Sequence, residues 1–211
     1  VAPDYVLVHQ SREQQLVEAL VAEIRRMYSS APLASPDLPK IINQRHFERL
    51  VGLLGSGVIS HGGQIDPSAR KIAPTVLTDV TWDSPIMQEE IFGPILPILT
   101  YRKLDEAICR VQQRPKPLAL YLFTRSKQTE EKVLREVSFG GGCVNDTVLH
   151  LATSYMPFGG VGESGMGGYH GKASYDTFSH QKSILKRMAK PDVSLRYAPF
   201  EDKMKLLKKL M

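Results

Sequence analysis

The sequence predicts an α/β fold in which helices flank a mostly parallel sheet. The first observation is a β-α-β-α-β order at short spacing between Ile95 and Asp146, which is typical of helices packed on parallel strands. The second is a strand-like apolar run at Asp4–Val8, followed by a segment with the repeat of an amphipathic helix. We therefore expect a strand and a helix at the start of the sequence, and strands and helices that alternate from Ile95 to Asp146.

The N-terminal part of this pattern begins with a buried strand at 4–8. Ser11 and Gln14 then have the spacing of a capping box, in which both side chains serve free amides at a helix start. The helix that follows has one apolar stripe, made of Leu16, Leu20, Ile24 and Met27 with Val17 and Val21 beside it. Prolines in 29–40 predict a loop. A second helix is expected at Gln44–Leu54, and its buried residues would be Phe47, Leu50, Val51 and Leu54.

Short apolar runs and helical periods fill the middle of the chain. Strands are predicted at 57–63, 73–80, 95–101, 118–124 and 142–146, and helices at 104–113 and 126–137. After Asp146 the pattern stops, and residues 147–172 are rich in Gly, Ser, Pro and Tyr. A loop of this length inside a compact domain is usually functional. A late strand at 174–185 and a short basic helix at the C-terminus complete the prediction.

The composition excludes several classes of protein. The formal charge of +5 over 211 residues is modest, and much of it lies in the C-terminal "KMKLLKKLM", so no nucleic-acid surface is expected. No apolar run approaches the roughly 20 residues that span a bilayer. Residues 1–8 lack the basic head and small-residue cleavage site of a signal peptide, so we expect none, and we expect no membrane contact. Only two cysteines occur, which is typical of a reducing cytoplasm.

Several motifs resemble known sites but lack the required context. Residues 160–165 match G-x-G-x-x-G, yet no helix can easily follow them because "GMGG" comes next, so a dinucleotide loop is not favoured. Ser164 lacks the second glycine of a nucleophile elbow, because Met166 stands there. The six histidines show no spacing typical of metal ligands, and we expect no metal site.

The two thiols also favour a structural interpretation. Cys109 lies inside a predicted amphipathic helix, and Cys143 lies at a predicted strand after three glycines. A cysteine nucleophile needs a lowered pKa, from a helix N-terminus or a cationic neighbour. Neither thiol has such a neighbour nearby in the sequence, so a small buried residue is the favoured interpretation.

Two stretches have no simple structural explanation. In "MQEEIFGPILPI", Glu89 and Glu90 point in different directions, so one carboxylate can be solvated while the other is held inward beside Phe92. Such a carboxylate next to an aromatic ring could bind hydroxyl groups beside a flat ring. The alternative is a strand start with an exposed acidic pair. The second stretch is the glycine-rich loop at 157–180, which is bracketed by Phe158, Tyr169 and Phe178.

Taken in order, "EEIFGP", "PLALYLFT", "VND" and "PFGGVGESGMGGYHGKASYDTFSH" resemble the C-terminal part of an aldehyde dehydrogenase. "YHGK" and "DTFSH" resemble the class 3 branch of that family. The resemblance runs from Val1 to about Tyr197. It also implies that "VAPDYVLV" follows the family's nucleophilic cysteine, which is expected just before residue 1, so no catalytic nucleophile is assigned within this sequence.

The resemblance implies roles for five residues. Glu90 resembles the carboxylate that binds the nicotinamide-ribose hydroxyls of NAD or NADP, and Phe92 resembles the aromatic that positions the nicotinamide ring. Asn145, His150 and Phe158 resemble the wall of the aldehyde tunnel. The two groups are expected to share one cleft. In the family, a cysteine thiolate attacks the aldehyde, hydride passes to NAD(P)+, and water activated by a glutamate hydrolyses the thioester.

The resemblance also implies a domain organisation and partners. Residues 1–171 would be part of the catalytic domain, 172–190 an oligomerisation strand, and 191–211 a tail with a short basic helix. The partners implied are an aliphatic or aromatic aldehyde and, in the full-length family, a second copy in a homodimer. The reacting cysteine, the glutamate base and the cofactor domain lie outside these motifs, so we expect the lone chain to be inactive.

Two other functions stay open from the sequence. The chain could be a pseudoenzyme or interaction module that pairs with a full-length relative or a separate N-terminal half. It could also be a cysteine or serine hydrolase that uses Cys143 or Ser164.

Overall fold

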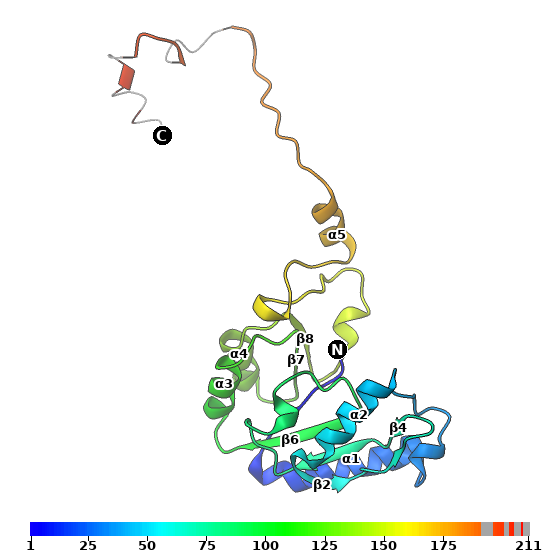
Figure 1. Cartoon of the computed structure of the whole chain (residues 1–211). Coiled ribbons are helices and arrows are strands. Elements are labelled where there is room, and N and C mark those ends of the chain that lie inside the picture. The colour runs from blue at the N-terminus through cyan, green and yellow to red at the C-terminus, as the bar shows by residue number, and fades with distance from the viewer. Residues whose placement is uncertain (191–195, 201–202, 205–207, 209–211) are drawn as a thin grey trace. The chain divides into compact units, whose positions relative to one another are not determined.

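A computed structural model describes residues 1–190, 196–200, 203–204 and 208. The chain forms two compact units, Val1–Thr177 and Phe178–Met211, and the first carries nearly all the regular structure (Figure 1). Its strands are β1 (Val6–His9), β2 (Val58–His61), β3 (Ile65–Asp66), β4 (Lys71–Ile72), β5 (Thr75–Thr78), β6 (Ile95–Tyr101), β7 (Ala119–Leu122) and β8 (Gly141–Val144). Its α-helices are α1 (Glu13–Tyr28), α2 (Gln44–Leu53), α3 (Leu104–Gln112) and α4 (Lys127–Glu136), while α5 (Gly171–Phe178) reaches the boundary between the units.

The α/β fold with mostly parallel strands is confirmed. The largest sheet has the order β1-β6-β5-β2, in which β6 pairs in parallel with β1 and β5, and β2 is the antiparallel edge. A second parallel pair joins β7 to β8, with Tyr121 opposite Cys143. The short β3 and β4 form an antiparallel hairpin. The β6-α3-β7-α4-β8 order is therefore as predicted, although β6 and β7 belong to separate sheets.

Two apolar clusters hold these layers together. In the larger one, Phe47 and Leu50 of α2 pack with Ile72, Leu77 and Ile95. In the smaller one, Ile108 of α3 and Val133 of α4 pack together with the partly buried Leu120 and Leu122 of β7. The amphipathic helices predicted from the sequence thus pack against the four-stranded sheet and against the β7–β8 pair. Helix α1 is the exception, because none of its residues is fully buried and Met27 is exposed.

Side-chain caps begin two of the helices, whereas the one cap predicted from the sequence is absent. The Asn43 side chain accepts a hydrogen bond from the amide of His46 at 2.8 Å and begins α2, and Ser126 caps α4 in the same way. The capping box predicted at Ser11 is wrong. Residues Gln10–Arg12 form a 3-10 turn, and the Ser11 hydroxyl bonds to the His9 ring instead.

The strand predicted at 174–185 is also wrong. Residues 174–178 belong to α5, where Ser174 accepts a hydrogen bond from the amide of His170 and Lys172 pairs with Asp176 one turn later. Such contacts between residues four apart stabilise a helix. Residues 179–190 are described and contain no strand. The basic helix predicted at the C-terminus lies mostly outside the described residues. Within the described stretches, no helix is long and apolar enough to cross a bilayer.

Replacing Leu50 with alanine tests the larger cluster. Leu50 is fully buried, so Leu50→Ala should lower the free energy of unfolding by about 2–5 kcal/mol through the cavity it leaves. Leu134→Ala is the matched control, because Leu134 is helical and 42% exposed, and it should cost less than about 1 kcal/mol. Urea denaturation measures both values, and equal losses would contradict the assigned core.

Candidate functional site

The segment Glu89–Phe92 leads into β6 and has one buried and three exposed side chains. Ile91 is buried, whereas Glu89 and Glu90 are exposed and Phe92 is 70% exposed. The expectation that one of the two carboxylates is held inward is therefore wrong. Phe92 has a φ of 53°, a left-handed conformation that bulky residues rarely adopt. A strained and exposed aromatic persists only where the surrounding contacts fix the backbone.

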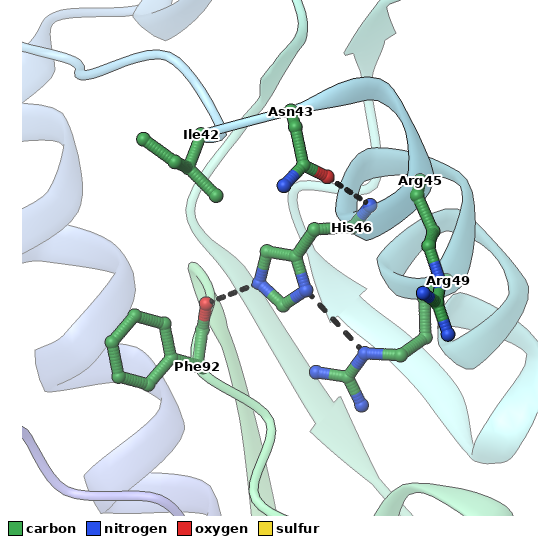
Figure 2. A pocket seen from close by; sticks show the side chains of 6 residues that line it. All are labelled: Ile42, Asn43, Arg45, His46, Arg49 and Phe92. Carbon is green, nitrogen blue, oxygen red and sulfur yellow. Dashed lines mark hydrogen bonds between the residues drawn. The ribbon is translucent and has the colours of Figure 1, made fainter.

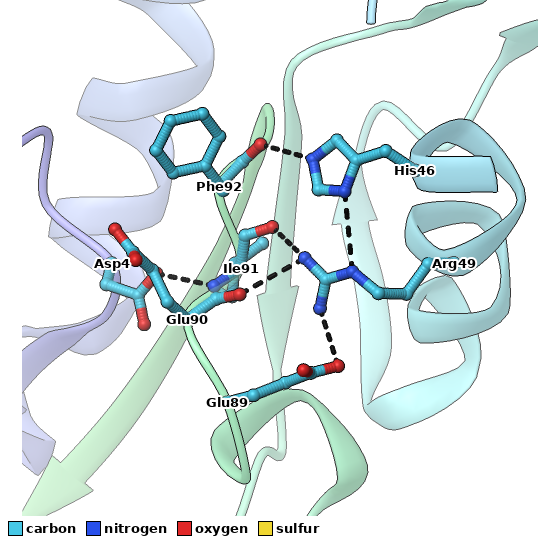
Figure 3. Close-up of polar contacts among 7 residues, drawn as sticks. All are labelled: Asp4, His46, Arg49, Glu89, Glu90, Ile91 and Phe92. Carbon is cyan, nitrogen blue, oxygen red and sulfur yellow. Dashed lines mark hydrogen bonds and ion pairs between the residues drawn. The ribbon is translucent and has the colours of Figure 1, made fainter. Parts of the chain in front are cut away.

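Arg49 of α2 supplies most of those contacts (Figure 3). Its guanidinium donates hydrogen bonds to the backbone carbonyls of Glu90 and Ile91 and forms an ion pair with the Glu89 carboxylate at 2.8 Å. The rigid fork of an arginine suits this kind of multiple contact. The partly buried Arg49 thus fixes three consecutive residues. In the described part of the chain, the Glu90 carboxylate makes no hydrogen bond or ion pair of its own, so it is available to a ligand.

His46 extends the same clamp by one residue. Its Nε2 donates to the Phe92 carbonyl at 2.8 Å, and its Nδ1 accepts from Arg49 Nε at 3.4 Å. These two contacts are consistent with a single neutral tautomer. The close approach of α2 also depends on Gly93, because a Cβ there would lie 2.6 Å from Leu50. Helix α2 therefore packs directly against the segment whose side chains the sequence assigned to the cofactor.

Asp4 holds the segment from the other side. Its Oδ1 accepts a hydrogen bond from the Ile91 amide at 2.9 Å. Burial raises the pKa of the Asp4 carboxyl, the Ile91 amide partly offsets this, and the nearby Glu90 carboxylate raises that pKa further. Figure 3 shows the Asp4 and Glu90 side chains on the side of the segment opposite to Arg49. Arg49 and His46 of α2 and one carboxylate from the start of the chain thus meet at four consecutive residues.

An open hollow of about 520 Å³ lies beside Phe92 (Figure 2). Its lining is Ile42, Asn43, Arg45, His46, Arg49 and Phe92. The ring of Phe92 forms one wall and the start of α2 forms the other. This hollow combines cationic groups with an exposed flat ring, which suits an anionic or hydroxylated ligand with an aromatic part.

The residues predicted to line the substrate tunnel form a second group. The His150 ring lies 5.8 Å from the rings of both Phe158 and Tyr121. His150 is buried, and burial lowers the pKa of its imidazole. Asn145 is not directed at this cluster, since its side chain accepts a hydrogen bond from the Thr124 amide at 2.9 Å. The structure therefore joins His150 to Phe158, while Asn145 stabilises the turn after β7.

The start of the chain connects the two groups. The Tyr121 hydroxyl donates to the Val1 carbonyl at 2.6 Å, and three residues later Asp4 binds the Ile91 amide. Three peptide steps span at most roughly 11 Å, so the aromatic cluster and the Glu89–Phe92 segment lie close together. The hollow beside Phe92 is not lined by His150 or Phe158, and a single cleft that contains both groups stays a prediction.

Four residues of this site were not identified from the sequence: Asp4, His46, Arg49 and Tyr121. His46 and Arg49 are three residues apart beside the apolar Phe47 and Leu50, so they read as the polar side of an ordinary amphipathic helix. Their partners lie about forty positions away, and Arg49 and Glu90 are 41 positions apart in the sequence. In the sequence, only the acidic pair at 89–90 indicated that a cationic side chain would lie nearby.

Removing the Arg49 clamp should loosen the segment it holds. Arg49→Met keeps much of the apolar stem but deletes the donors to Glu90 and Ile91, so amide hydrogen exchange over 89–93 should rise. Arg45→Met is the matched control, because Arg45 lines the same hollow from the same helix and is exposed. Exchange followed by mass spectrometry measures the effect, and equal exchange in the two variants would contradict the clamp.

Asp4 should make stability depend on pH in a defined direction. Because its folded pKa is raised, Asp4 contributes stability that is complete below the unfolded pKa of about 3.9 and is lost as the pH rises through the folded pKa. Asp4→Asn does not titrate, so it should gain stability relative to wild type as the pH rises from about 4 to about 7.

Urea denaturation at several pH values measures this difference. Asp66→Asn is the control of opposite sign, since a hydrogen bond from Ser68 lowers the pKa of Asp66. That variant should lose stability relative to wild type as the pH rises toward about 4, below the range in which Asp4→Asn gains it, and should change little from about 4 to about 7. A fall for Asp4→Asn as the pH rises would show that its pKa is lowered rather than raised.

Comparison with known proteins gives the same family throughout. The profile described as "Aldehyde dehydrogenase family" matches residues 1–184. Aldehyde dehydrogenase family 3 member B1 of Rattus norvegicus is 55% identical over 203 residues, which are 95% of this chain and 43% of the relative. This relative confirms the class 3 resemblance.

Solved structures agree. The substrate-bound state of Staphylococcus aureus AldH matches with a TM-score of 0.91 and 50% identity, and the match covers 100% of this chain and 46% of that one. The NAD+ complex of an aldehyde dehydrogenase from Bacillus cereus matches with a TM-score of 0.74 and 28% identity, over 86% of this chain and 38% of that one. The chain spans less than half of the length of these proteins. It belongs to the aldehyde dehydrogenase family.

Proposed function

We propose that this chain supplies the C-terminal part of an NAD(P)+-dependent aldehyde dehydrogenase that oxidises aldehydes to carboxylic acids. The observation that carries the proposal is the exposed Glu90 carboxylate, which has no described partner and stands beside the exposed Phe92 on a backbone fixed by Arg49. The alternative is a pseudoenzyme or interaction module that pairs with a full-length relative or a separate N-terminal half.

The residues present fit the nicotinamide half of the cofactor. An ionised carboxylate without a partner can accept two hydrogen bonds from neighbouring ribose hydroxyls, and such charge-assisted bonds are strong. The exposed face of Phe92 can orient a flat ring beside that sugar. The cofactor, when bound, accepts the hydride. The role proposed for this chain is to bind and orient the cofactor. None of its residues is assigned to the choice between NAD and NADP.

The aldehyde would enter beside the second group. Phe158 is a partly buried aromatic in contact with His150 and Tyr169, and its apolar area suits an alkyl or aryl tail. We propose His150 and Phe158 as part of the wall. A homodimer and a cytoplasmic location are also proposed, the latter because only two cysteines occur and the described ones are free.

A chimaeric enzyme tests the role of Glu90. The upstream part of a class 3 relative, including its nucleophile, would be fused to this chain, and aldehyde oxidation followed by NAD(P)H absorbance. Glu90→Gln should raise the KM for the cofactor about 10-fold to 100-fold, since a hydrogen bond to a charged group contributes about 1.5–3 kcal/mol. Glu131→Gln, on the exposed side of α4, should leave the KM unchanged.

The same preparation separates the two functions. The isolated chain should show no aldehyde oxidation, and an active chimaera supports the enzyme. Binding of this chain to a separate N-terminal half without activity would favour the interaction module. A KM for the cofactor that is insensitive to Glu90→Gln in an active chimaera would contradict the assigned role.

A further inference from the structure

Cys143 and His150 form a thiol–imidazole pair that the mechanism above does not use. Cys143 Sγ lies 3.6 Å from His150 Nδ1, within contact range for a sulfur hydrogen bond. The sequence alone favoured a passive buried thiol, because no cation or base stood near it. The fold supplies the missing base from seven residues further along the chain.

The strand geometry shows why these groups meet. Alternate residues of β8 face the same side, so Gly141 and Cys143 both face His150. Gly141 leaves the space for the ring, because a Cβ there would lie 3.1 Å from His150 Cδ2. Tyr121, opposite Cys143 in the β7–β8 pair, packs its ring against the same imidazole. Any larger residue at position 141 would displace the base from the thiol.

His150 itself is poorly satisfied where it lies. It is 7% exposed, and its Nε2 is buried without a hydrogen-bond partner in the described structure. An unpaired buried polar atom is destabilising, and such an atom usually has a functional or ligand-related reason. With Nδ1 directed at sulfur, the ring can take the thiol proton and return it.

We propose that Cys143 is a second reactive thiol that is modified by α,β-unsaturated aldehydes. Cys143 is partly exposed, and the neighbouring rings of Tyr121 and Phe158 make an apolar surface for a short alkenyl chain. Thiolates are soft nucleophiles and the β-carbon of an enal is a soft electrophile. The inference uses only groups of this chain and does not depend on the proposed oxidoreductase function.

The step balances without an oxidant or a cofactor. His150 Nδ1 accepts the thiol proton, and the sulfur forms a bond to the β-carbon as the C=C π bond breaks. The electron pair moves to the carbonyl as an enolate. The α-carbon of the enolate then takes the proton back from the imidazolium. The net change is addition of S–H across the double bond, which leaves the aldehyde intact and the histidine neutral.

Competition between the two thiols of the same molecule tests the proposal. The 211-residue chain would be treated with limiting trans-2-hexenal, and peptides containing Cys143 and Cys109 would be quantified by mass spectrometry. Cys109 is the internal control, because it is exposed and has Gln113 rather than a base beside it. The ratio of the two modification rates in the folded chain is divided by the same ratio measured in concentrated urea. This division removes any difference between the two thiols that does not come from the folded structure.

The expected ratio, Cys143 over Cys109, is on the order of tenfold after this correction, because His150 can accept the Cys143 thiol proton as the sulfur attacks, whereas Cys109 has Gln113 beside it. A corrected ratio of one or below overturns the proposal. His150→Gln should lower modification at Cys143 without changing Cys109, and circular dichroism checks that this variant is folded. Hexanal, which lacks the double bond, should give no stable adduct, and the wild-type ratio decides the outcome if His150→Gln unfolds.

Discussion

The hydrogen bonds from Arg49 to the backbone of Glu90 and Ile91 are the constraint on which the site depends. They hold an exposed segment whose own packing is limited to one buried side chain, Ile91. Without them, nothing in the described structure except the Asp4 and His46 contacts would keep Phe92 in a left-handed conformation. The strain at Phe92 is therefore tolerated because helix α2 and the start of the chain both hold the segment Glu89–Phe92.

Chain connectivity brings the second group to this segment. Residues 1–4 are bound at one end by Tyr121 and at the other by the Ile91 amide. Tyr121 packs against His150, which in turn contacts Phe158. A short stretch of backbone thus joins the residues proposed for the cofactor to those proposed for the aldehyde. This proximity is what a hydride transfer between the two molecules requires.

The sequence predicted the fold well where local periodicity decided it. The alternation from β6 to β8 was predicted nearly residue for residue, because amphipathic helices and short apolar strands each bury one face. The prediction from the sequence failed at Ser11 and at 174–178, because contacts between side chains close in the sequence stabilise a different local structure there. At the candidate site, Glu90 and Phe92 were proposed from a sequence motif. Arg49 and Cys143 were not, because only folding brings their contact partners to them.

A crystal structure of the chimaeric enzyme with its cofactor would test the central claim most directly. The account predicts that both oxygens of the Glu90 carboxylate lie about 2.6–2.9 Å from the nicotinamide-ribose hydroxyls, that the ring of Phe92 contacts the nicotinamide, and that Arg49 still binds the Glu90 and Ile91 carbonyls. A bound cofactor whose ribose lies away from Glu90, with Phe92 directed into solvent, would contradict it.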